Sequence, residues 1–312
     1  MRKILVTGAS GFVGSEVIRR FKEDNSFWLR AIDRKPCTMD NIEFIENDLA
    51  AIDSLAAVLK DIDCVVHCLV DIKANYSSVG ISSRNFDLLL ELLEACRVEN
   101  VRQFVLISSS TVFRIDSGQI SINDGSLPNS LDTYGKVRGK MEQLLIQYSP
   151  FLSISIIRPH IIIGKDRAGI FDFIVRRLKT NKWLFLPKSI NSFHQTIHVK
   201  DLAGIVYEIV KNNYSYTMNV GYVPMSTIMT YLKGLKASLK STSKIILLPG
   251  IVTKIVVFLA DKVGLNLLGP NRQVIENNGF VMGCSILHDQ PGFQPLLFNE
   301  ASAWEDSFAT MV

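Results

Sequence analysis

The pattern of apolar and polar positions divides the chain into two parts. Up to residue 159, short apolar runs typical of buried strands alternate with stretches whose apolar positions recur at helical spacing. Strands are predicted within Ile4–Val6, Phe27–Ile32, Ile42–Ile45, Cys64–Leu69, Phe104–Ile107 and Leu152–Ile157. Helices are predicted after Ser15 and over Ile52–Lys60, Asn85–Asn100 and Tyr134–Tyr148. This alternation predicts an α/β fold with a doubly wound parallel sheet.

After Arg158-Pro159 the alternation stops, although further helices are predicted over Ile170–Thr180 and Asp201–Lys211. We therefore expect a first domain over residues 1–159, to which residues 195–219 return. Residues 160–312 are expected to form a smaller, substrate-binding lobe.

A glycine motif directly follows the first predicted strand, with Gly8, Gly11 and Gly14 spaced three apart. In a strand–turn–helix context, such glycines permit a tight turn, backbone approach to a pyrophosphate and close packing of the helix. The alternative is a glycine-rich turn in another kind of α/β protein. Asp33, at the end of the second apolar run, favours a Rossmann-type dinucleotide site because its carboxylate suits the ribose hydroxyls of NAD. NADP is the alternative cofactor, because Arg34 and Lys35 follow Asp33 and could accommodate a 2′-phosphate.

Composition limits the other classes of function. The chain has 312 residues, 47% of them hydrophobic, and its net charge of +4 is too small to indicate nucleic-acid binding. The five cysteines (Cys37, Cys64, Cys68, Cys96 and Cys284) lack metal-ligand or redox spacing. Together with the absence of an opening secretory signal, they lead us to expect reduced thiols, no metal and a cytoplasmic protein.

The most apolar stretch is Ile245–Ala260, which Pro249, Gly250 and Lys254 interrupt. It is shorter than the roughly 20 residues that a membrane span needs, so we expect no stable membrane insertion. A buried helix is the expected structure, and peripheral membrane contact is the alternative.

Two features indicate chemistry. The fifth predicted strand ends in Ser108-Ser109-Ser110-Thr111, and Tyr134 and Arg138 share one face of a predicted helix. A tyrosine beside a cation is suited to general acid–base catalysis, because positive charge favours the phenolate form. The alternative is a surface tyrosine with an exposed charge.

These elements resemble the extended short-chain dehydrogenase/reductases, the NAD-dependent epimerase/dehydratase family that includes nucleotide-sugar epimerases and reductases. The resemblance is strong over about residues 1–220 and faint beyond. The matching elements are Thr7-Gly8-x-x-Gly11-x-x-Gly14, Asp33, Asp48-Leu49, His67, Asn85, Ser108–Phe113, Tyr134 with Glu142, Arg158-Pro159, His198–Ala203 and Gly292-Phe293-Gln294-Pro295.

The resemblance implies a role for each matching residue. Tyr134 would be the acid–base group, Ser109 would hydrogen-bond the same substrate oxygen, and Arg138 would supply positive charge. The cofactor would be held by Gly8, Ser10, Gly11, Phe12, Val13, Gly14, Asp33, Arg34, Asp48, Leu49, Cys68, Leu69, Val70, Asn85, Ser108, Tyr134, Arg138 and Pro159. Ser110, His160 and Arg167 are expected to contact substrate.

Two positions depart from the family pattern. Arg138 stands where the family has lysine, and its planar guanidinium places its donors differently. Ile161 stands where many sugar-nucleotide enzymes have asparagine, which weakens the case for an epimerase and leaves room for a ketoreductase.

The resemblance therefore implies an NAD(P)-dependent nucleotide-diphosphate-sugar epimerase or 4-ketoreductase with a small-molecule substrate. A reductase of a non-sugar carbonyl and a catalytically impaired cofactor-binding protein are the alternatives. A homodimer is also expected. Two predicted helices carry apolar residues beyond one stripe, among them Leu88–Leu90, Leu92, Leu93 and Leu144–Ile146, and relatives pair through these helices.

Overall fold

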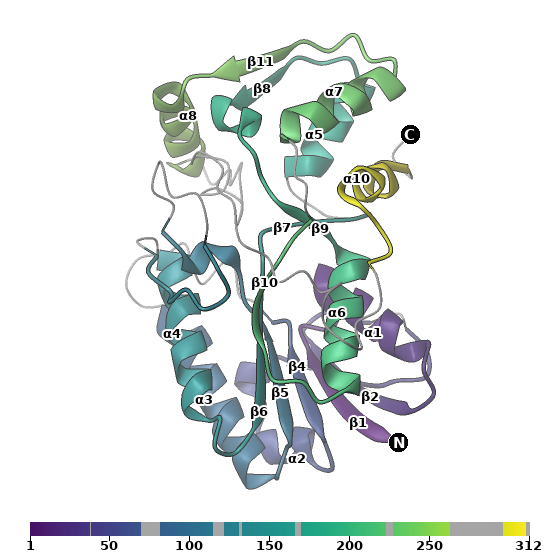
Figure 1. Ribbon diagram of the computed structural model, residues 1–312, viewed down its shortest axis with the longest axis vertical. Coiled ribbons are helices and arrows are strands. Elements are labelled where there is room, and N and C mark those ends of the chain that lie inside the picture. Colours follow the sequence, from purple (N-terminus) through teal and green to yellow (C-terminus); the bar gives the residue numbers. More distant parts are fainter. Residues whose placement is uncertain are drawn as a thin grey trace.

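The computed structural model describes residues 1–37, 39–69, 82–114, 122–130, 133–165, 170–222, 227–262 and 296–309. Its centre is a seven-stranded sheet in the order β10-β6-β5-β4-β1-β2-β3, with parallel pairing throughout (Figure 1). The strands are β1 (Arg2–Thr7), β2 (Phe27–Asp33), β3 (Glu43–Glu46), β4 (Cys64–His67), β5 (Gln103–Ile107), β6 (Ser153–Pro159) and β10 (Thr217–Val220). The doubly wound α/β fold is thereby confirmed.

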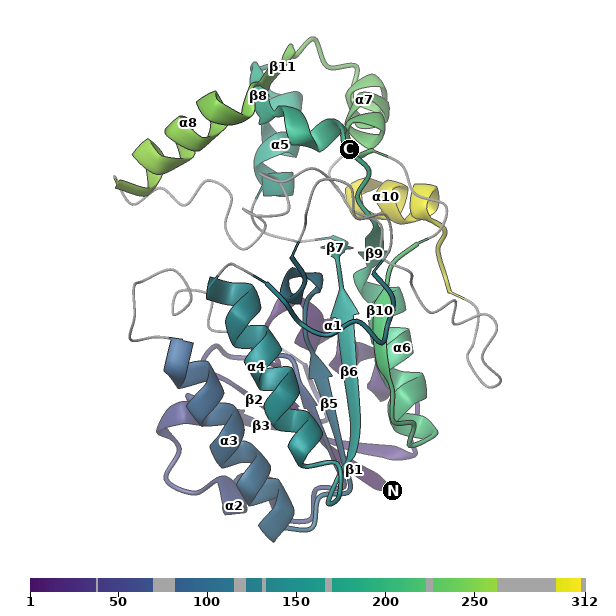
Figure 2. The ribbon, with the colours of Figure 1, turned by 60° about the vertical axis from the view of Figure 1, so that its left-hand side comes forward.

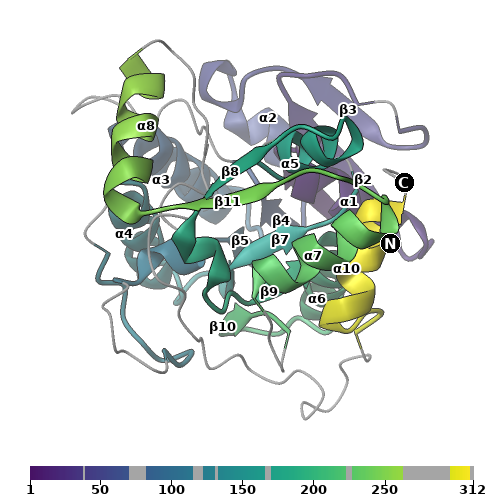
Figure 3. The same ribbon diagram turned by 90° about the horizontal axis from the view of Figure 1, so that it is seen from above.

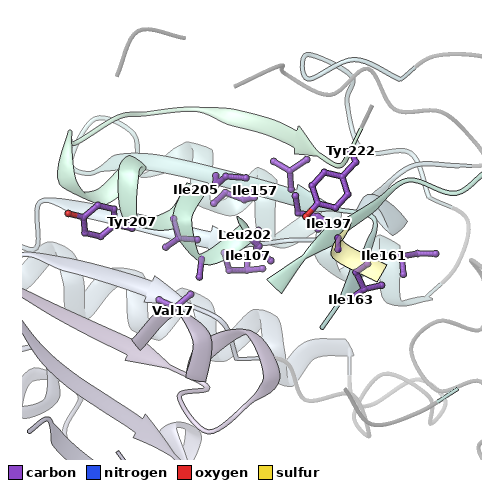
Figure 4. Packing of buried hydrophobic residues seen from close by; sticks show 14 of the residues in the cluster. Val17, Ile107, Ile157, Ile161, Ile163, Ile197, Leu202, Ile205, Tyr207 and Tyr222 are labelled. Atoms are coloured by element: carbon purple, nitrogen blue, oxygen red, sulfur yellow. The ribbon is translucent and has the colours of Figure 1, made fainter. Parts of the chain in front are cut away.

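Helices cover both faces of this sheet (Figure 2). One face packs against α1 (Phe12–Lys22) and α6 (Val199–Lys211), and Figure 4 shows Val17, Leu202 and Ile205 meeting Ile107 and Ile157 of the sheet. The other face packs against α2 (Leu55–Leu59), α3 (Ser82–Val98) and α4 (Thr133–Gln147). Because both faces are covered, central strands such as β4 and β5 are buried at every position.

The small lobe lies beyond the carboxyl ends of the central strands (Figure 1). Two parallel strand pairs form it, β8 (Leu184–Pro187) with β11 (Ile245–Leu248) and β7 (Ile161–Ile163) with β9 (Thr196–His198). Its helices are α5 (Ile170–Lys179), α7 (Ile228–Ser238), α8 (Gly250–Lys262) and α10 (Glu300–Ala309). Short 3₁₀ turns occur at Leu49–Ala51, Ser110–Val112 and Lys188–Asn191.

Residues 296–309 contact both α6 and the small lobe. The Asp201 carboxylate accepts hydrogen bonds from the backbone N–H groups of Leu297 (2.6 Å) and Phe298 (3.3 Å) and from the hydroxyl of Tyr222 (2.5 Å). The buried ring of Trp304 stacks on Tyr231, with 4.8 Å between ring centroids. The predicted Gly292–Pro295 motif lies outside the described residues.

One predicted element is shorter than expected, and another prediction is wrong. The helix predicted over Ile52–Lys60 forms as α2 and spans only Leu55–Leu59, because Ser54 caps it through the N–H of Ala57 and fixes a later start. The stretch Ile245–Ala260 is not a buried helix: its first four residues pair with β8 and the rest lie in α8, which exposes much of its apolar surface. No helix within the described ranges is both long and apolar enough to cross a membrane.

The leucine-rich helices α3 and α4 bury most of their apolar side chains within the chain. They pack against each other and the sheet, which buries Leu88, Leu89, Leu92, Leu93, Leu144 and Leu145. Among the apolar residues listed above for the two helices, Leu90 and Ile146 are the exposed ones. Most of the apolar surface that suggested a dimer is thus covered within one chain, and the homodimer stays a prediction. Cys37, Cys64, Cys68 and Cys96 are free thiols, and Cys284 lies outside the described residues.

Candidate functional site

The glycine turn between β1 and α1 is built for close approach of backbone. Gly8 has φ +71°, and a Cβ there would lie 2.8 Å from the backbone of Leu69. A Cβ on Gly14 would lie 2.2 Å from the carbonyl oxygen of Gly8, so α1 packs on the turn only because residue 14 is glycine. Gly11 caps α1 without a side chain and is exposed, while Phe12 and Val13 are half-buried. The N-terminus of α1 is therefore open to an anion such as a pyrophosphate.

Asp33 is held beside this turn at the end of β2. Its carboxylate accepts hydrogen bonds from the backbone N–H groups of Ser10 (3.1 Å) and Lys35 (3.0 Å). The Ser10 hydroxyl donates to the carbonyl of Lys35 at 2.7 Å, which closes the loop around the carboxylate. The guanidinium of Arg34 lies 3.8 Å from the carboxylate of Asp48, so it leans along the surface. This arrangement fits an adenosine ribose at Asp33.

Asp48 and Leu49, expected at the cofactor, lie at the start of the 3₁₀ turn that follows β3, with Asp48 as its N-cap. The Asp48 carboxylate accepts a hydrogen bond from the N–H of Ala50 at 3.1 Å, and the Leu49 side chain is buried in the core.

At the carboxyl end of β4, His67 is buried against β1. The hydroxyl of Thr7 lies 2.9 Å from Nδ1 of His67. Burial, assisted by the positive charge of Arg138, lowers the pKa of His67 to about 3, so this imidazole is neutral at physiological pH. Cys68 and Leu69 follow at the edge of the glycine turn and are half-buried, whereas Val70 lies outside the described residues.

Ser108, expected at the cofactor, points into the protein. Its hydroxyl hydrogen-bonds the carboxylate of Glu142 at 2.5 Å, and Glu142 forms a buried ion pair with Arg158 at 2.7 Å. Arg158 also donates to the carbonyl oxygens of Asp124 (3.0 Å) and Ser126 (3.3 Å). These contacts join β5, α4 and β6, so Ser108 helps to fix the elements that carry the neighbouring chemical groups.

Ser109 and Tyr134 belong to elements that pack together, because α4 lies on the Ser110–Val112 turn that Ser109 caps. Gly135 makes that packing fit: a Cβ there would lie 2.0 Å from the carbonyl oxygen of Thr111 and 2.2 Å from the hydroxyl of Ser130. The Ser109 oxygen accepts hydrogen bonds from the backbone N–H (3.2 Å) and the hydroxyl (3.0 Å) of Thr111, while its own proton can be donated. Sequence reasoning overlooked Gly135, although its place beside the tyrosine was a usable signal.

Arg138 contacts Tyr134 directly. Its Nε–H donates to the Tyr134 hydroxyl oxygen at 3.3 Å, and the guanidinium carbon lies 5.6 Å from the ring centroid. Arg138 is only 2% exposed, and its Nη1 has no hydrogen-bond partner among the residues that the structure describes. A buried donor without a partner is costly, so this atom fits a ligand oxygen such as a ribose hydroxyl.

Ser110 and His160, expected at the substrate, belong to a buried chain of polar groups. The Ser110 hydroxyl lies 2.7 Å from Nδ1 of His160, whose Nε2 lies 3.4 Å from Nδ1 of His194. Burial lowers the pKa of both histidines. The nearby His194 lowers the pKa of His160 further, while the hydrogen bond of His194 to the Ser189 carbonyl partly offsets the effect of burial on His194. His194, which follows Phe193 in the loop before β9, was not predicted, since a lone histidine carries no spacing signal.

Three predicted residues remain, Asn85, Pro159 and Arg167. Pro159 ends β6 and pairs in register with Val220, and Asn85 is buried on α3. Arg167 lies outside the described residues. Within those residues, no group of three or more metal-ligating side chains is placed to hold a metal ion.

Comparison with known proteins agrees with this geometry. A family model described as "NAD dependent epimerase/dehydratase family" matches residues 4–221. An uncharacterized UDP-glucose epimerase of Bacillus subtilis, YtcB, is 31% identical over 175 residues, which cover 50% of this chain and 54% of that protein. A 3β-hydroxysteroid dehydrogenase/Δ5→4-isomerase of Mycobacterium tuberculosis is 30% identical over 151 residues, covering 43% of this chain and 40% of the relative. The chain thus spans about half the length of these curated relatives.

Solved structures show the same fold over nearly the whole chain. The UDP-glucuronic acid 4-epimerase of Bacillus cereus, in complex with UDP-glucuronic acid and NAD, has a TM-score of 0.78 at 19% identity and covers 99% of this chain and 98% of its own. The UDP-glucose 4-epimerase of Thermotoga maritima, with UDP-glucose, has a TM-score of 0.77 at 15% identity, with 98% and 97% covered.

The family match confirms the resemblance drawn from the motifs, the enzyme class and NAD as the cofactor of the family. The match runs from β1 to β10 and so takes in the strands of the central sheet. The chain is therefore a member of the NAD-dependent epimerase/dehydratase family.

Proposed function

We propose that the protein is an NAD-dependent nucleotide-diphosphate-sugar epimerase or 4-ketoreductase in which Tyr134 exchanges a proton with the reacting oxygen. The observation that carries the proposal is the partly buried hydrogen bond between Tyr134 and the buried Arg138. Because the Tyr134 oxygen accepts from a cation, its own proton is available for transfer, and the negative charge left behind is stabilised.

The cofactor site supports this proposal. The open N-terminus of α1 would take the pyrophosphate, Asp33 the adenosine ribose, and the unpartnered Nη1 of Arg138 a hydroxyl of the nicotinamide ribose. NAD would supply hydride acceptance and return, while the protein supplies orientation and the proton route. Since Asp33 repels a 2′-phosphate and Arg34 leans towards Asp48, we propose that NAD binds in preference to NADP.

Ser109 would share the reacting oxygen with Tyr134. Its oxygen is fixed by Thr111, so its proton has a defined direction for donation to a ligand. Ser110 and His160 would border the sugar from the lobe side. Burial lowers the pKa of His160 and favours its neutral form, and the hydrogen bond with Ser110 orients the ring.

A reductase of a non-sugar carbonyl is the second candidate. The steroid dehydrogenase relative favours it, as does the apolar Ile161–Ile163 run, in which Ile161 and Ile163 are buried beside His160. The same acid–base pair would serve such a substrate, so the two candidates differ in the ligand and share the chemistry.

A thermal-shift and turnover screen tests the proposal. UDP-, dTDP- and GDP-sugars, with a steroid ketone as the comparison, would be tried with NAD or NADH present. A native-state ligand at 100 times its Kd adds about 2.7 kcal/mol of stability, so a true substrate raises Tm measurably. Stabilisation and turnover with a sugar nucleotide support the proposal. Turnover restricted to the steroid ketone supports the second candidate, and cofactor binding without any turnover contradicts both.

A further inference from the structure

Helix α8 presents an apolar face to solvent. Ile251, Val252, Ile255, Val256 and Leu259 are 76%, 40%, 53%, 42% and 56% exposed. At about 100° per residue these five positions fall within an arc of about 140° on one side of the helix. Thr253 lies outside this arc, is buried, and donates its hydroxyl to the carbonyl of Pro249 at 3.2 Å. The apolar arc is therefore the side turned away from the protein.

A second patch lies at the start of β8, where aromatic rings alternate with cations. Arg177 lies 5.5 Å from the ring centroid of Phe173 and donates to the carbonyl of Trp183 at 2.7 Å. Lys244 lies 5.3 Å from the Trp183 ring, whose centroid is 6.5 Å from that of Phe185. The three rings are 47%, 52% and 50% exposed, in the order Phe173, Trp183, Phe185. We call these five residues the aromatic patch.

The aromatic patch and α8 belong to one continuous surface region. Strands β8 and β11 pair in parallel from Leu184 opposite Ile245, so Lys244 of the patch directly precedes β11 and α8 follows it. Four strand residues span about 13 Å, which sets the separation of the two features. Figures 1 and 2 place α8, β8 and β11 together at the end of the molecule away from the N-terminus, and Figure 3 shows α8 along its side.

The excess of positive charge in the chain lies in this lobe. Residues 170–199 and 227–262 together contain eleven Lys and Arg but only two acidic residues, Asp172 and Asp261, and α10 adds three more, Glu300, Glu305 and Asp306. The whole chain contains 34 basic and 30 acidic residues, so the rest of the molecule has an acidic excess. The modest net charge of +4 conceals this separation into a basic lobe and an acidic remainder.

We propose that the small lobe docks on an anionic phospholipid surface, with the apolar arc of α8 and the aromatic patch entering the headgroup boundary. Exposed Ile and Leu side chains on a short helix, with Trp beside Lys and Arg, are the combination that binds at a membrane interface. The lobe's basic excess provides the attraction to anionic headgroups. With thirteen residues, α8 lies on the membrane and does not cross it.

Charge distinguishes this occupant from a second copy of the chain. A two-fold pairing through this region would bring the same excess of cations against itself, and like charges oppose association. An anionic lipid surface instead complements the eleven cations. The proposal does not depend on the proposed catalytic function, since no residue of the α8 face or of the aromatic patch is among those assigned to the cofactor or the substrate.

Vesicle co-sedimentation of the full chain tests it. Vesicles of phosphatidylcholine alone would be compared with vesicles containing about 30% phosphatidylglycerol, at low and high salt. We expect at least tenfold stronger partitioning to the anionic vesicles, reduced by salt. The double variant Ile255→Gln/Leu259→Gln should partition at least tenfold more weakly, because both side chains lose their apolar contact with lipid.

The matched control is Val98→Gln/Ile146→Gln, which alters two side chains of similar exposure (62% and 51%) on α3 and α4. It should partition as the unaltered chain does, and the Tm of both variants should stay unchanged. Equal partitioning to neutral and anionic vesicles, or an equal loss in the control, would overturn the proposal. A lipid-free dimer that the Ile255→Gln/Leu259→Gln variant converts to monomer would show that a second copy covers the face, and would overturn it as well.

Discussion

The sheet domain and the small lobe use their apolar residues in opposite ways. In the sheet domain, every position of β4 and β5 is buried, and most of the leucines of α3 and α4 pack inside the chain. In the lobe, every position of β11 is only half-buried, and α8 exposes five apolar side chains. The difference teaches that an apolar run predicts burial only where the topology supplies a cover for each of its faces.

Their polar groups differ in the same way. The sheet domain buries charged groups, as in the paired cluster of Ser108, Glu142 and Arg158. The lobe keeps its cations at the surface, where Arg177 and Lys244 lie over exposed rings. A substitution of a charge should therefore be severe in the first region and mild in the second.

The largest expected effect breaks the buried pair. Glu142→Gln removes the negative charge and leaves the Arg158 guanidinium buried without its counter-ion, which should cost about 3–5 kcal/mol of unfolding free energy. Urea unfolding measures this. The control Glu23→Gln removes an exposed partner of Arg20 and should cost about 1 kcal/mol or less. Equal losses in the two variants would contradict the contrast.

The next prediction compares two tyrosines at opposite ends of α4, Tyr134 and Tyr148. Tyr134→Phe removes the proposed proton donor and keeps the ring, so turnover of an identified substrate should fall about 100-fold or more, with NAD affinity little changed. The control is Tyr148→Phe. Tyr148 directly follows α4, at the opposite end of that helix from Tyr134, and its hydroxyl hydrogen-bonds Glu94 of α3. Steady-state kinetics and NAD titration measure both. Unchanged turnover in Tyr134→Phe would assign the acid–base role elsewhere.

Acid should weaken the junction between the two regions. Burial lowers the pKa of His160, His194 and His198, the last to about 4, as it lowers that of His67 in the sheet domain to about 3. The unfolded chain, with ordinary pKa values near 6.5, then binds more protons than the folded chain below that pH. Stability present above pH 6.5 should be lost as the pH falls towards 4, by at most about 1.4 kcal/mol per pH unit for each histidine.

Urea midpoints between pH 7 and pH 4 check this slope. His67→Asn removes one titrating group while its amide can still meet the Thr7 hydroxyl, so its slope should be shallower than that of the unaltered chain. A flat stability profile from pH 7 to pH 4 would show that these histidines are not held neutral.

The contrast between the regions also explains which features could be predicted from the sequence. The glycine spacing at Gly8, Gly11 and Gly14 predicted the turn, because only glycine meets its steric demands. The pairing of Tyr134 with Arg138 followed from helical spacing alone. Both features are local, and their chemistry depends on few distant contacts.

Features that depend on distant contacts could not be predicted. His194 meets His160 only because β7 and β9 pair across more than thirty residues of chain. The exposure of α8 depends on what else packs on the lobe, which an apolar run alone does not reveal. Chemistry set by local spacing was therefore predictable, whereas burial that depends on distant contacts was not, either for α8 or for the leucines of α3 and α4.

The smallest expected effect is the most specific to this chain. Arg138→Lys keeps the positive charge at a position where related enzymes carry lysine, but it changes the donor geometry. In the present structure, Nε of Arg138 reaches the Tyr134 hydroxyl, and Nη1 stays available for a ligand. If Arg138 performs the proposed role, a lysine ammonium should serve both partners, and turnover should be unchanged or raised a few-fold. Arg138→Met, which removes the charge, should lower turnover and weaken NAD binding together. A loss in Arg138→Lys as large as that in Arg138→Met would show that the guanidinium geometry, rather than its charge, is what the site requires.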